Sequence, residues 1–523
     1  MAETYDYIVV GGGSAGCVLA ARLSEDATCR VLVLESGPPD DDPRLRMPAA
    51  APTFWQGPYA RDDWTVPQTH AGGRRVFLSG GRTLGGGSTI NGMVYVRGNR
   101  ADYDAWRDAY GCDGWGFDEL EPYFRRAEDE ALRIDAGGYV HPLSRLWVDA
   151  AVTAGLAVAA DFDGAVQDGA GFYRATRHDG RRRSAADAYL RPAMTRPNLT
   201  VRTGVTVTRV LVERGRAVGV RTAAGVIRAE REVLLSAGAI GSPHVLLLSG
   251  IGPAAELAAH GVDVVADAPR VGAGLQDHPR CLVEWSTPEV RNLWEDATPA
   301  SVALWEETGT GPMASCGAEA GAFARTRDGL VAPDLQLGAI PGPVPGPVAP
   351  DRRGITALVG AVAVRSRGRL ALRSADPAVA PAVDPGYLTD GADLAVLVAG
   401  VGIAREIAAS RPLADVVAAE RTPGPDVTGN ALRDWVRGDL DTMFHLTGTC
   451  AMGGDEESVC DPLLRVRGVE GLRVVDASVF PAASRGNTNG PTIAVAERAA
   501  DLVRGQDVAS STAAARSSIG RTP

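Results

Sequence analysis

Three closely spaced glycines near the N-terminus constrain this chain more than any other feature. A short apolar run, residues 7–10, leads directly into the G-x-G-x-x-G spacing formed by Gly11, Gly13 and Gly16. Such a run is typical of a strand covered on both faces. The glycines let the backbone turn tightly, let a pyrophosphate approach it and let the next helix lie close to the sheet. The pattern predicts a βαβ unit whose helix aims its free N–H groups at phosphates.

The second strand of this unit ends at Glu35. An acidic residue about twenty positions beyond the glycines can accept hydrogen bonds from both ribose hydroxyls. The same carboxylate would repel a 2′-phosphate, so a free 2′-hydroxyl is favoured. The unit therefore predicts FAD or NAD, used in redox chemistry. A structural βαβ unit that binds no nucleotide is the alternative.

Length, charge and cysteine usage limit the class of protein. A chain of 523 residues exceeds what one core usually supports, so two domains are expected. The net charge of -11 argues against nucleic acid or an anionic membrane surface as a partner. We expect a cytoplasmic protein, because no signal segment and no apolar run near bilayer length is visible. The seven cysteines include no C-x-x-C pair and the seven histidines are scattered, so no metal site is expected.

The first half of the chain continues with alternating local patterns. The glycine run 85–87 and Ser88 predict a second backbone segment that approaches the cofactor, with a plain hinge loop as the alternative. Helices are expected between residues 102 and 130, and strands with a hairpin over 198–222. The basic cluster at 177–184 is most simply a solvated loop. A strand at 233–238 leads to a helix opened by Ser242 and Pro243 as N-cap and N1.

Composition changes after residue 275 and changes back after about 435. The intervening part predicts antiparallel strands at 355–364 and 369–374, a helix at 393–408 and a proline-rich loop at 341–353. A strand at 472–478 and an amphipathic helix ending near 505 follow. Residues 507–523 are expected to be disordered, because they cannot bury a core.

Several segments, taken in order, resemble the glucose–methanol–choline (GMC) oxidoreductase family. They are GRTLGGGSTIN at 81–91, GAIGSPHVLLLSGIGP at 238–253, GAGLQDHP at 272–279, LRSADPAVAPAVDPGYL at 372–388, HLTGTCAMG at 445–453 and GNTNGPT at 486–492. The resemblance extends over nearly the whole chain. It implies an α/β (α+β) fold with a Rossmann-like FAD-binding domain and a substrate domain built on an antiparallel sheet.

The resemblance also implies how the chain is divided. The FAD-binding domain is expected to be discontinuous, over 1–155, 196–275 and 436–506, and the substrate domain to comprise 156–195 and 276–435. Some family members attach FAD through a histidine just before the asparagine of the first signature. This chain has Ile90 before Asn91, so noncovalent FAD is expected.

Alcohol oxidation requires a hydride acceptor, a base and a polar group that holds the substrate oxygen. The resemblance implies flavin N5 as the acceptor, His445 as the base and Asn487 as its partner. A neutral histidine with a pKa near the working pH suits the base, and Asn487 would hydrogen-bond the oxygen as alkoxide character develops. A satisfied core histidine is the plainer interpretation of His445. Asn489 is the alternative to Asn487; with Asn487 as the partner, Asn489 would face the flavin.

The residues expected to bind FAD lie in the glycine turn, at the strand ends and in the family signatures. They are Gly11, Gly13, Ser14, Ala15, Gly16, Glu35, Ser88, Asn91, Gly92, Met93, Val207, Ala237, Asp476, Ala477, Asn489, Pro491 and Thr492. Asp476 could instead be a strand-end turn residue. Residues 276–278 are interpreted as structural.

The predicted activity is therefore oxidation of a primary or secondary alcohol to the carbonyl compound. The motifs leave the electron acceptor open between O₂ and a quinone or protein carrier, and they leave the oligomeric state open. The substrate pocket is not readable from the motifs, although Phe444, Cys316 and Val364 are candidates for its wall. The alternative is a non-redox, flavin-containing hydroxynitrile lyase.

Overall fold

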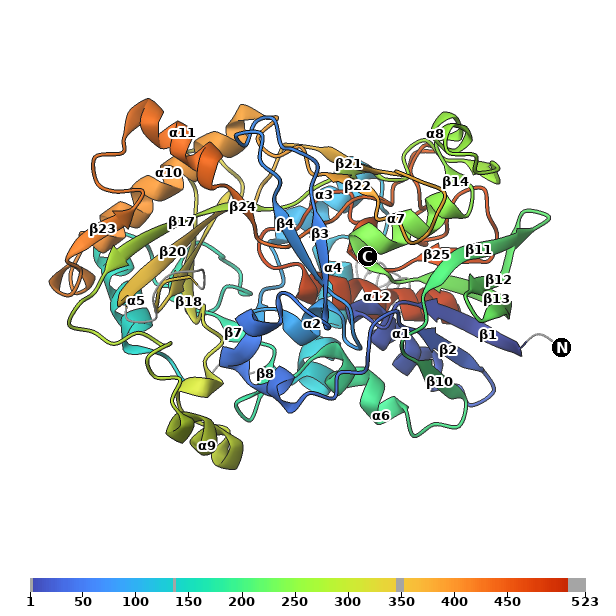
Figure 1. Cartoon of the computed structure of the whole chain (residues 1–523), viewed down its shortest axis with the longest axis horizontal. Helices are drawn as coiled ribbons and strands as arrows, with labels where there is room; N and C mark the ends of the chain where they lie inside the picture. Colours follow the sequence, from blue (N-terminus) through green and yellow to red (C-terminus); the bar gives the residue numbers. More distant parts are fainter. Residues whose placement is uncertain (1–2, 135–137, 345–351, 507–523) are drawn as a thin grey trace, which may run out of the picture.

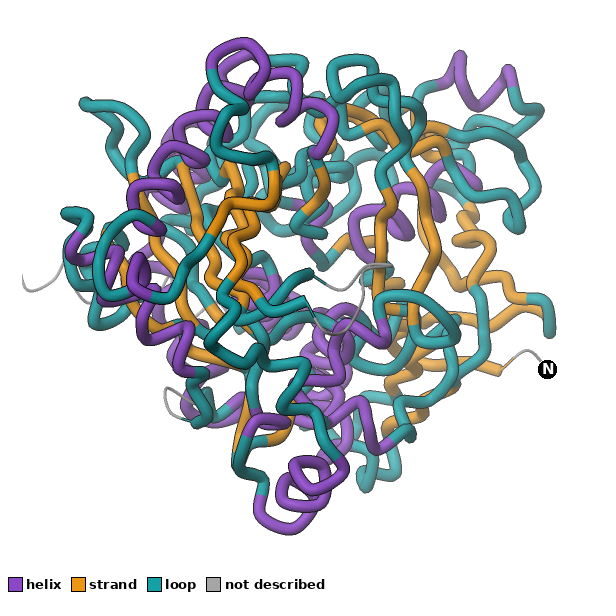
Figure 2. The backbone as a smooth tube through the Cα atoms, turned by 60° about the vertical axis from the view of Figure 1, so that its left-hand side comes forward, coloured by secondary structure: helices purple, strands orange, loops and turns teal. Residues whose placement is uncertain are grey.

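The computed structural model describes residues 3–134, 138–344 and 352–506. The predicted tail from residue 507 lies outside these residues, as do positions 345–351 of the proline-rich loop. Within the described residues the backbone forms two seven-stranded sheets. Figure 1 shows the sheet containing β1 (Glu3–Val10) at the right and the sheet containing β20 (Gly354–Ala361) at the left. Figure 2 shows the same two groups of strands with helices between and around them.

The first sheet is mainly parallel and contains the predicted βαβ unit. Its order is β10-β2-β1-β13-β12-β11, with β25 paired to β13. The bounds are β10 Leu199–Arg202, β2 Val31–Leu34, β13 Gly225–Leu235, β12 Arg216–Thr222, β11 Val207–Glu213 and β25 Leu472–Val474. Val10 of β1 lies beside both Leu34 of β2 and Leu235 of β13, so these parallel strands end together. Their carboxyl edge is where an open α/β sheet binds ligands.

Helix α1 (Ser14–Leu23), which follows the glycine turn, packs against α12 (Asn489–Arg504). The prediction of an amphipathic C-terminal helix is wrong for α12, because every residue from 490 to 501 is buried. Buried Glu497 accepts hydrogen bonds from Arg22 at 2.9 Å and from the Tyr189 hydroxyl at 2.8 Å, and it pairs with Arg126 at 2.7 Å. The charged positions of α12 therefore face partners and not water.

The second sheet is antiparallel throughout. Its order is β23-β17-β20-β19-β18-β6, with β24 paired to β17. The bounds are β23 Ala419–Thr422, β17 Pro279–Ser286, β19 Leu335–Ile340, β18 Ala320–Ala324, β6 Gly169–Phe172 and β24 Asp441–Thr442. Helices α10 (Gly391–Ala408), α11 (Gly429–Asp439) and α5 (Pro142–Thr153) pack against this sheet or against one another beside it. None of the helices in the described ranges combines the length and the apolarity that crossing a bilayer requires.

Two parts of the chain join the sheets in ways that the sequence patterns do not indicate. Helix α5, which lies in the expected FAD-binding segment 1–155, packs on β6 and β18 of the second sheet and on helix α10. The antiparallel strands predicted at 355–364 and 369–374 are confirmed as β20 and β21 (Gly368–Ala371), which belong to different sheets and do not pair with each other. Instead, β21 joins a separate small sheet with β16 (Ala273–Leu275) and β22 (Ala382–Asp384).

The helix of the second signature, α7, begins five residues earlier than predicted. It spans Gly238–Leu248, so Ser242 and Pro243 lie inside it and not at its N-terminus. Pro243 has no N–H to give to the carbonyl of Ala239 in the preceding turn. That carbonyl instead accepts a hydrogen bond from Thr449 Oγ1 at 2.7 Å. A tertiary contact therefore makes the interior proline tolerable.

The basic cluster at 177–184 is not the solvated loop that its composition predicts. It forms a hairpin of β8 (Arg177–His178) and β9 (Arg181–Arg182), and the side chains of Arg177 and Arg182 are buried. Arg177 donates to the carbonyl of Ala314 and Arg182 donates to the carbonyl of Leu45 at 2.9 Å. The composition of the cluster predicts exposure because the carbonyl groups that accept its hydrogen bonds come from segments distant in the sequence.

We predict that Glu497→Gln lowers the free energy of unfolding by about 3–5 kcal/mol, because Arg22 and Arg126 lose the fully buried carboxylate that lies between them. Glu25→Gln is the matched control: Glu25 also pairs with Arg22, at 3.0 Å, but its side chain is 38% exposed. That loss is expected to stay within about 1 kcal/mol. Urea unfolding midpoints of the full chain measure both, and equal midpoints would contradict the prediction.

Candidate functional site

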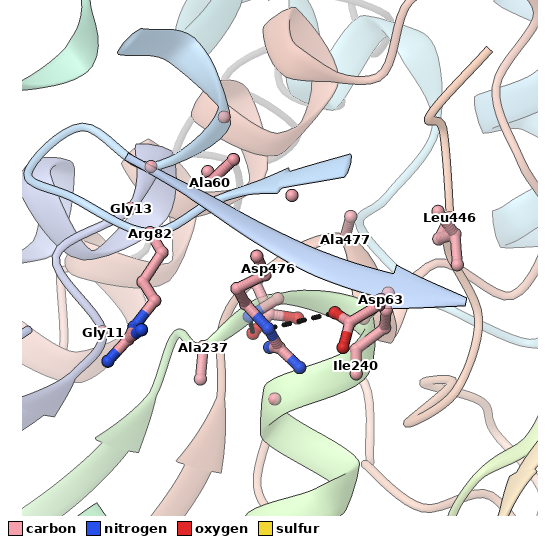
Figure 3. A pocket seen from close by; sticks show the side chains of 18 of the residues that line it. Gly11, Gly13, Ala60, Asp63, Arg82, Ala237, Ile240, Leu446, Asp476 and Ala477 are labelled. Carbon is pink, nitrogen blue, oxygen red and sulfur yellow. Dashed lines mark hydrogen bonds and ion pairs between the residues drawn. The ribbon is translucent and has the colours of Figure 1, made fainter. Parts of the chain in front are cut away.

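One cavity of about 900 Å³ lies at the carboxyl edge of the first sheet and extends toward the second. Its volume is in the upper range of cofactor sites. Figure 3 shows the Gly11–Gly13 turn, Ala237 and Asp476 around it, with β3 (Ala60–Trp64) crossing in front. This strand and its partner β4 (Phe77–Gly81) form the hairpin at the centre of Figure 1.

The glycine turn at one end of the cavity requires the absence of side chains. Gly11 has φ +101°, and a Cβ there would lie 2.5 Å from the Ser236 carbonyl oxygen. Gly86, with φ +54°, approaches the turn so closely that its Cβ would lie 2.8 Å from Cα of Gly13. Two glycine segments from different parts of the chain thus form one bare backbone surface, as a pyrophosphate site needs.

Glu35 shapes this turn as well as facing the cavity. Its Oε2 accepts from the N–H of Gly12 at 2.8 Å and its Oε1 accepts from the N–H of Gly37 at 2.7 Å. Burial raises the pKa of this carboxyl. Each carboxylate oxygen can accept a further hydrogen bond, so the side chain can hold the turn and a ribose hydroxyl together.

Asp476 connects the strand edge to α7. Its Oδ2 accepts from the N–H of Gly238 at 2.9 Å and from the hydroxyl of Ser242, and its Oδ1 accepts from the N–H of Ser478 at 2.8 Å. Asp476 is therefore a turn residue that also lines the cavity. Ser242, predicted as an N-cap, serves instead as a contact of this carboxylate.

Most of the residues expected to bind FAD line the cavity. These are Gly11, Gly13, Ser14, Ala15, Glu35, Asn91, Gly92, Met93, Val207, Ala237, Asp476, Ala477, Asn489 and Thr492. His445 and Asn487 also line it, so the structure brings the predicted catalytic pair to the same cavity as the glycine turn.

Three of the expected cofactor residues are absent from the lining formed by the described residues. Gly16 packs under the turn, where a Cβ would lie 1.9 Å from the Gly11 carbonyl oxygen. Ser88 is turned away and donates to the Gly85 carbonyl at 2.6 Å. Pro491 is buried within α12. These positions shape the backbone around the cavity and do not form its surface.

Of the wall residues suggested by the sequence, Phe444 lines the cavity. Cys316 packs instead in a cluster with Met93 and Ala175, and Val364 belongs to the apolar core beside the second sheet. Both side chains are therefore set behind the wall.

His445 and Asn487 face each other across a short distance. Nε2 of His445 lies 3.2 Å from Nδ2 of Asn487, and Nδ1 of His445 lies 3.0 Å from Nδ1 of His278. The Asn487 oxygen accepts from Gln336 Nε2 at 3.2 Å, which leaves its amide nitrogen for His445. Because that nitrogen only donates, Nε2 of His445 carries the lone pair and Nδ1 carries the proton, which goes to His278.

The interpretation of residues 276–278 as structural is incomplete. Besides the ring contact of His278, Oδ1 of Asp277 accepts from the backbone N–H of His278 at 2.9 Å and of His445 at 2.8 Å. Its Oδ2 accepts from the hydroxyls of Tyr387 and Thr442. The Asp-His pair in the QDHP segment was the available signal, but sequence alone could not show that it meets His445.

Burial sets the protonation state of His445. Desolvation first, and then the positive charge of Arg280, lower its pKa to about 3. This differs from the expected pKa near the working pH. The imidazole is consequently neutral at neutral pH, in agreement with the hydrogen-bond pattern, in which Nε2 carries the lone pair.

Comparison with known proteins gives a consistent result. Residues 5–280 and 364–496 match the sequence profiles of GMC oxidoreductases. The chain is 40% identical to an oxygen-dependent choline dehydrogenase of Brucella canis, over 96% of each chain. It is 39% identical to an alcohol dehydrogenase [acceptor] of Pseudomonas putida, over 97% of each chain. The crystal structure of pyridoxine 4-oxidase from Mesorbium loti superposes with a TM-score of 0.87 at 30% identity, over 96% of this chain and 99% of that one.

The cavity fits the cofactor of this family. A bare glycine turn at the start of α1, a carboxylate at the end of β2 and a cavity long enough to reach His445 match the parts of a dinucleotide. The chain therefore belongs to the GMC oxidoreductase family, and it is an FAD-dependent oxidoreductase acting on CH–OH donors.

Proposed function

We propose that this protein oxidises a primary or secondary alcohol to the carbonyl compound, with His445 as general base and Asn487 holding the substrate oxygen. Bound FAD supplies the hydride acceptor at N5. The observation that carries the proposal is the contact of 3.2 Å between His445 Nε2 and Asn487 Nδ2 on the cavity wall. It places an acceptor and a donor where one hydroxyl group can meet both.

The two side chains act on the same oxygen in opposite ways. His445 Nε2 takes the hydroxyl proton, and the Nδ1 proton remains directed at His278. The amide of Asn487 donates to the oxygen as negative charge develops on it. Tyr173, Gln336 and Asn487 form a chain of hydrogen bonds that fixes the amide before the substrate arrives. Prepositioned donors of this kind lower a barrier because they need no reorganisation.

The N-terminus of α12 adds a third element. Thr488, Asn489 and Thr492 line the cavity, so the positive end of this long helix faces the site. Ser14 Oγ donates to Asn489 Oδ1 at 2.7 Å and holds the starts of α1 and α12 together. We infer that the two helix starts favour negative charge on the pyrophosphate at α1 and on the flavin ring at α12.

The substrate end of the cavity is aromatic and apolar. Trp55 and Phe444 face each other with ring centroids 6.2 Å apart, and Met443 and Leu446 line the same region. This wall suits an alkyl or aryl alcohol. A quaternary ammonium alcohol such as choline, named for relatives, could contact the two rings, although buried Arg280 lies 6.0 Å from the centre of the Phe444 ring.

We propose noncovalent FAD, because Ile90 provides no nucleophile at the position before Asn91 and its side chain is buried. We also propose the division into an FAD-binding part over 1–155, 196–275 and 436–506 and a substrate part over 156–195 and 276–435, with α5 of the first segment packed on the second sheet. A cytoplasmic location is proposed from the seven cysteines, each of which the structure describes as free and buried.

Anaerobic mixing of the holoenzyme with a panel of alcohols tests the activity. Bleaching of the flavin absorbance supports alcohol oxidation. Cyanide release from a cyanohydrin without bleaching would support the lyase alternative. If no compound causes either bleaching or cyanide release, both hypotheses are refuted. Repeating the reaction in air and measuring peroxide distinguishes O₂ from a quinone or protein carrier as electron acceptor.

We predict that His445→Ala retains FAD and slows flavin reduction by about 10²–10⁴-fold, the usual contribution of a general base. Stopped-flow absorbance gives the rate, and the flavin released on denaturation gives the occupancy. A near-parental reduction rate in a variant that holds FAD would remove His445 from the mechanism.

Asp277→Ala is predicted to reduce the flavin reduction rate by about tenfold or more, because the backbone at His445 loses its acceptor. It should also destabilise the chain, since each buried donor left without a partner costs about 1–3 kcal/mol. Asp277→Asn keeps an oxygen for the two N–H groups and is expected to recover most of the rate. If the two variants have the same rate and melting temperature, Asp277 does not position His445.

A further inference from the structure

A buried arginine behind the cavity wall has no anionic partner. The side chain of Arg182 is 3% exposed, and it donates to the carbonyl oxygens of Leu45 at 2.9 Å and Ser88 at 3.2 Å and to Oδ1 of Asn91 at 2.9 Å. Its Nη2 is buried with no hydrogen-bond partner among the described residues. No carboxylate among the described residues forms an ion pair with Arg182. Burying a cation in this way is costly unless a charge compensates it.

The neighbouring carboxylates are already used by other arginines. Asp187 accepts from Arg46 at 2.8 Å and from Arg191 at 2.9 Å, and Asp40 also pairs with Arg191. Among the described residues, this cluster contains the guanidinium groups of Arg46, Arg182 and Arg191 and the carboxylates of Asp40 and Asp187. Its net charge is therefore one positive charge. Burial lowers the pKa of Arg182 to about 9, so that the group stays protonated at neutral pH.

Arg182 also decides which end of the Asn91 amide faces the cavity. Oδ1 of Asn91 accepts from Arg182 and from the backbone N–H of Met93 at 3.0 Å. Both partners are donors, so the oxygen is fixed on their side. Asn91 lines the same cavity as His445. Its amide nitrogen is therefore the polar atom that it can offer to a ligand there.

We propose that Arg182 is a positioning residue for the flavin ring: it turns the amide nitrogen of Asn91 toward the ring, and its uncompensated charge favours the ring when it becomes negative. The inference rests on the proposed location of the ring beside Asn91 and His445. It explains why the basic hairpin is buried and why its charge is retained. A purely structural Arg182 would stabilise the fold and leave the reactivity of the flavin unchanged.

Sulfite tests this inference without any alcohol substrate. Its sulfur adds to N5 of an oxidised flavin, the electron pair moves into the ring, and the negatively charged adduct loses the flavin absorbance. Affinity for sulfite therefore reports how well the site stabilises a negative ring. The holoenzymes of Arg182→Met, Arg182→Lys and Asn91→Asp are titrated after their FAD content has been measured.

We expect the parent to form the adduct at millimolar sulfite. Arg182→Met should weaken it by about tenfold or more, as expected for loss of one charge at a distance of order 10 Å. Asn91→Asp, which keeps the guanidinium but pairs it with a carboxylate, should weaken it similarly. Arg182→Lys should lie nearer to the parent. If Arg182→Met does not fold, Asn91→Asp decides the question.

Arg181→Met is the matched control, because it removes one charge from the same hairpin. Arg181 donates to the carbonyls of Trp305 and Glu306 and stacks on the Trp305 ring, away from Asn91. Its sulfite affinity should equal that of the parent. Parental affinity in both Arg182→Met and Asn91→Asp, or no adduct in the parent, would overturn the inference. Adduct formation in a protein whose flavin no alcohol reduces would instead refute the proposed function.

Discussion

The geometry of the candidate active site depends on one buried carboxylate, Asp277. Its two oxygens accept hydrogen bonds from the backbone N–H groups of His278 and His445 and from the hydroxyls of Thr442 and Tyr387. Burial raises its pKa to about 6, but these donors oppose that effect and favour the charged form. Phe444, the residue before His445, has φ +62°, a conformation that costs free energy at a non-glycine residue, and the hydrogen bonds of Asp277 help to stabilise the backbone here.

The same anchoring explains why the site needs both sheets. His278 directly precedes β17 and His445 follows β24, so both histidines belong to the edge of the second sheet that meets the cavity. Gln336 comes from β19 and fixes Asn487, which lies in the loop before α12. The glycine turn and Glu35 come from the first sheet. A cofactor lying along the cavity would therefore have its phosphates held by one sheet and its reacting end by the other.

Sequence patterns predicted those features of the fold that depend on residues close together in the chain. The glycine turn and the strand ending at Glu35 could be predicted because both depend on residues within one βαβ unit. His445 and Asn487 could be chosen only through the family resemblance, since nothing near them distinguishes a base from a core histidine. Helix α12 was predicted as amphipathic and the hairpin at Arg182 as a solvated loop, because their charges are visible in the sequence whereas their distant partners are not.

Buried charges in this fold thus serve two physically different purposes. Glu497 is surrounded by Arg22, Arg126 and Tyr189, so its charge is satisfied within the protein and contributes to joining α12 to α1 and to the helical segments that carry Arg126 and Tyr189. Arg182 has neutral oxygens as partners and keeps an excess of positive charge. A pair that is complete in the chain can serve stability alone. A charge that the chain leaves uncompensated beside its cofactor cavity raises the energy of the unliganded protein, and a negative ligand recovers that energy on binding.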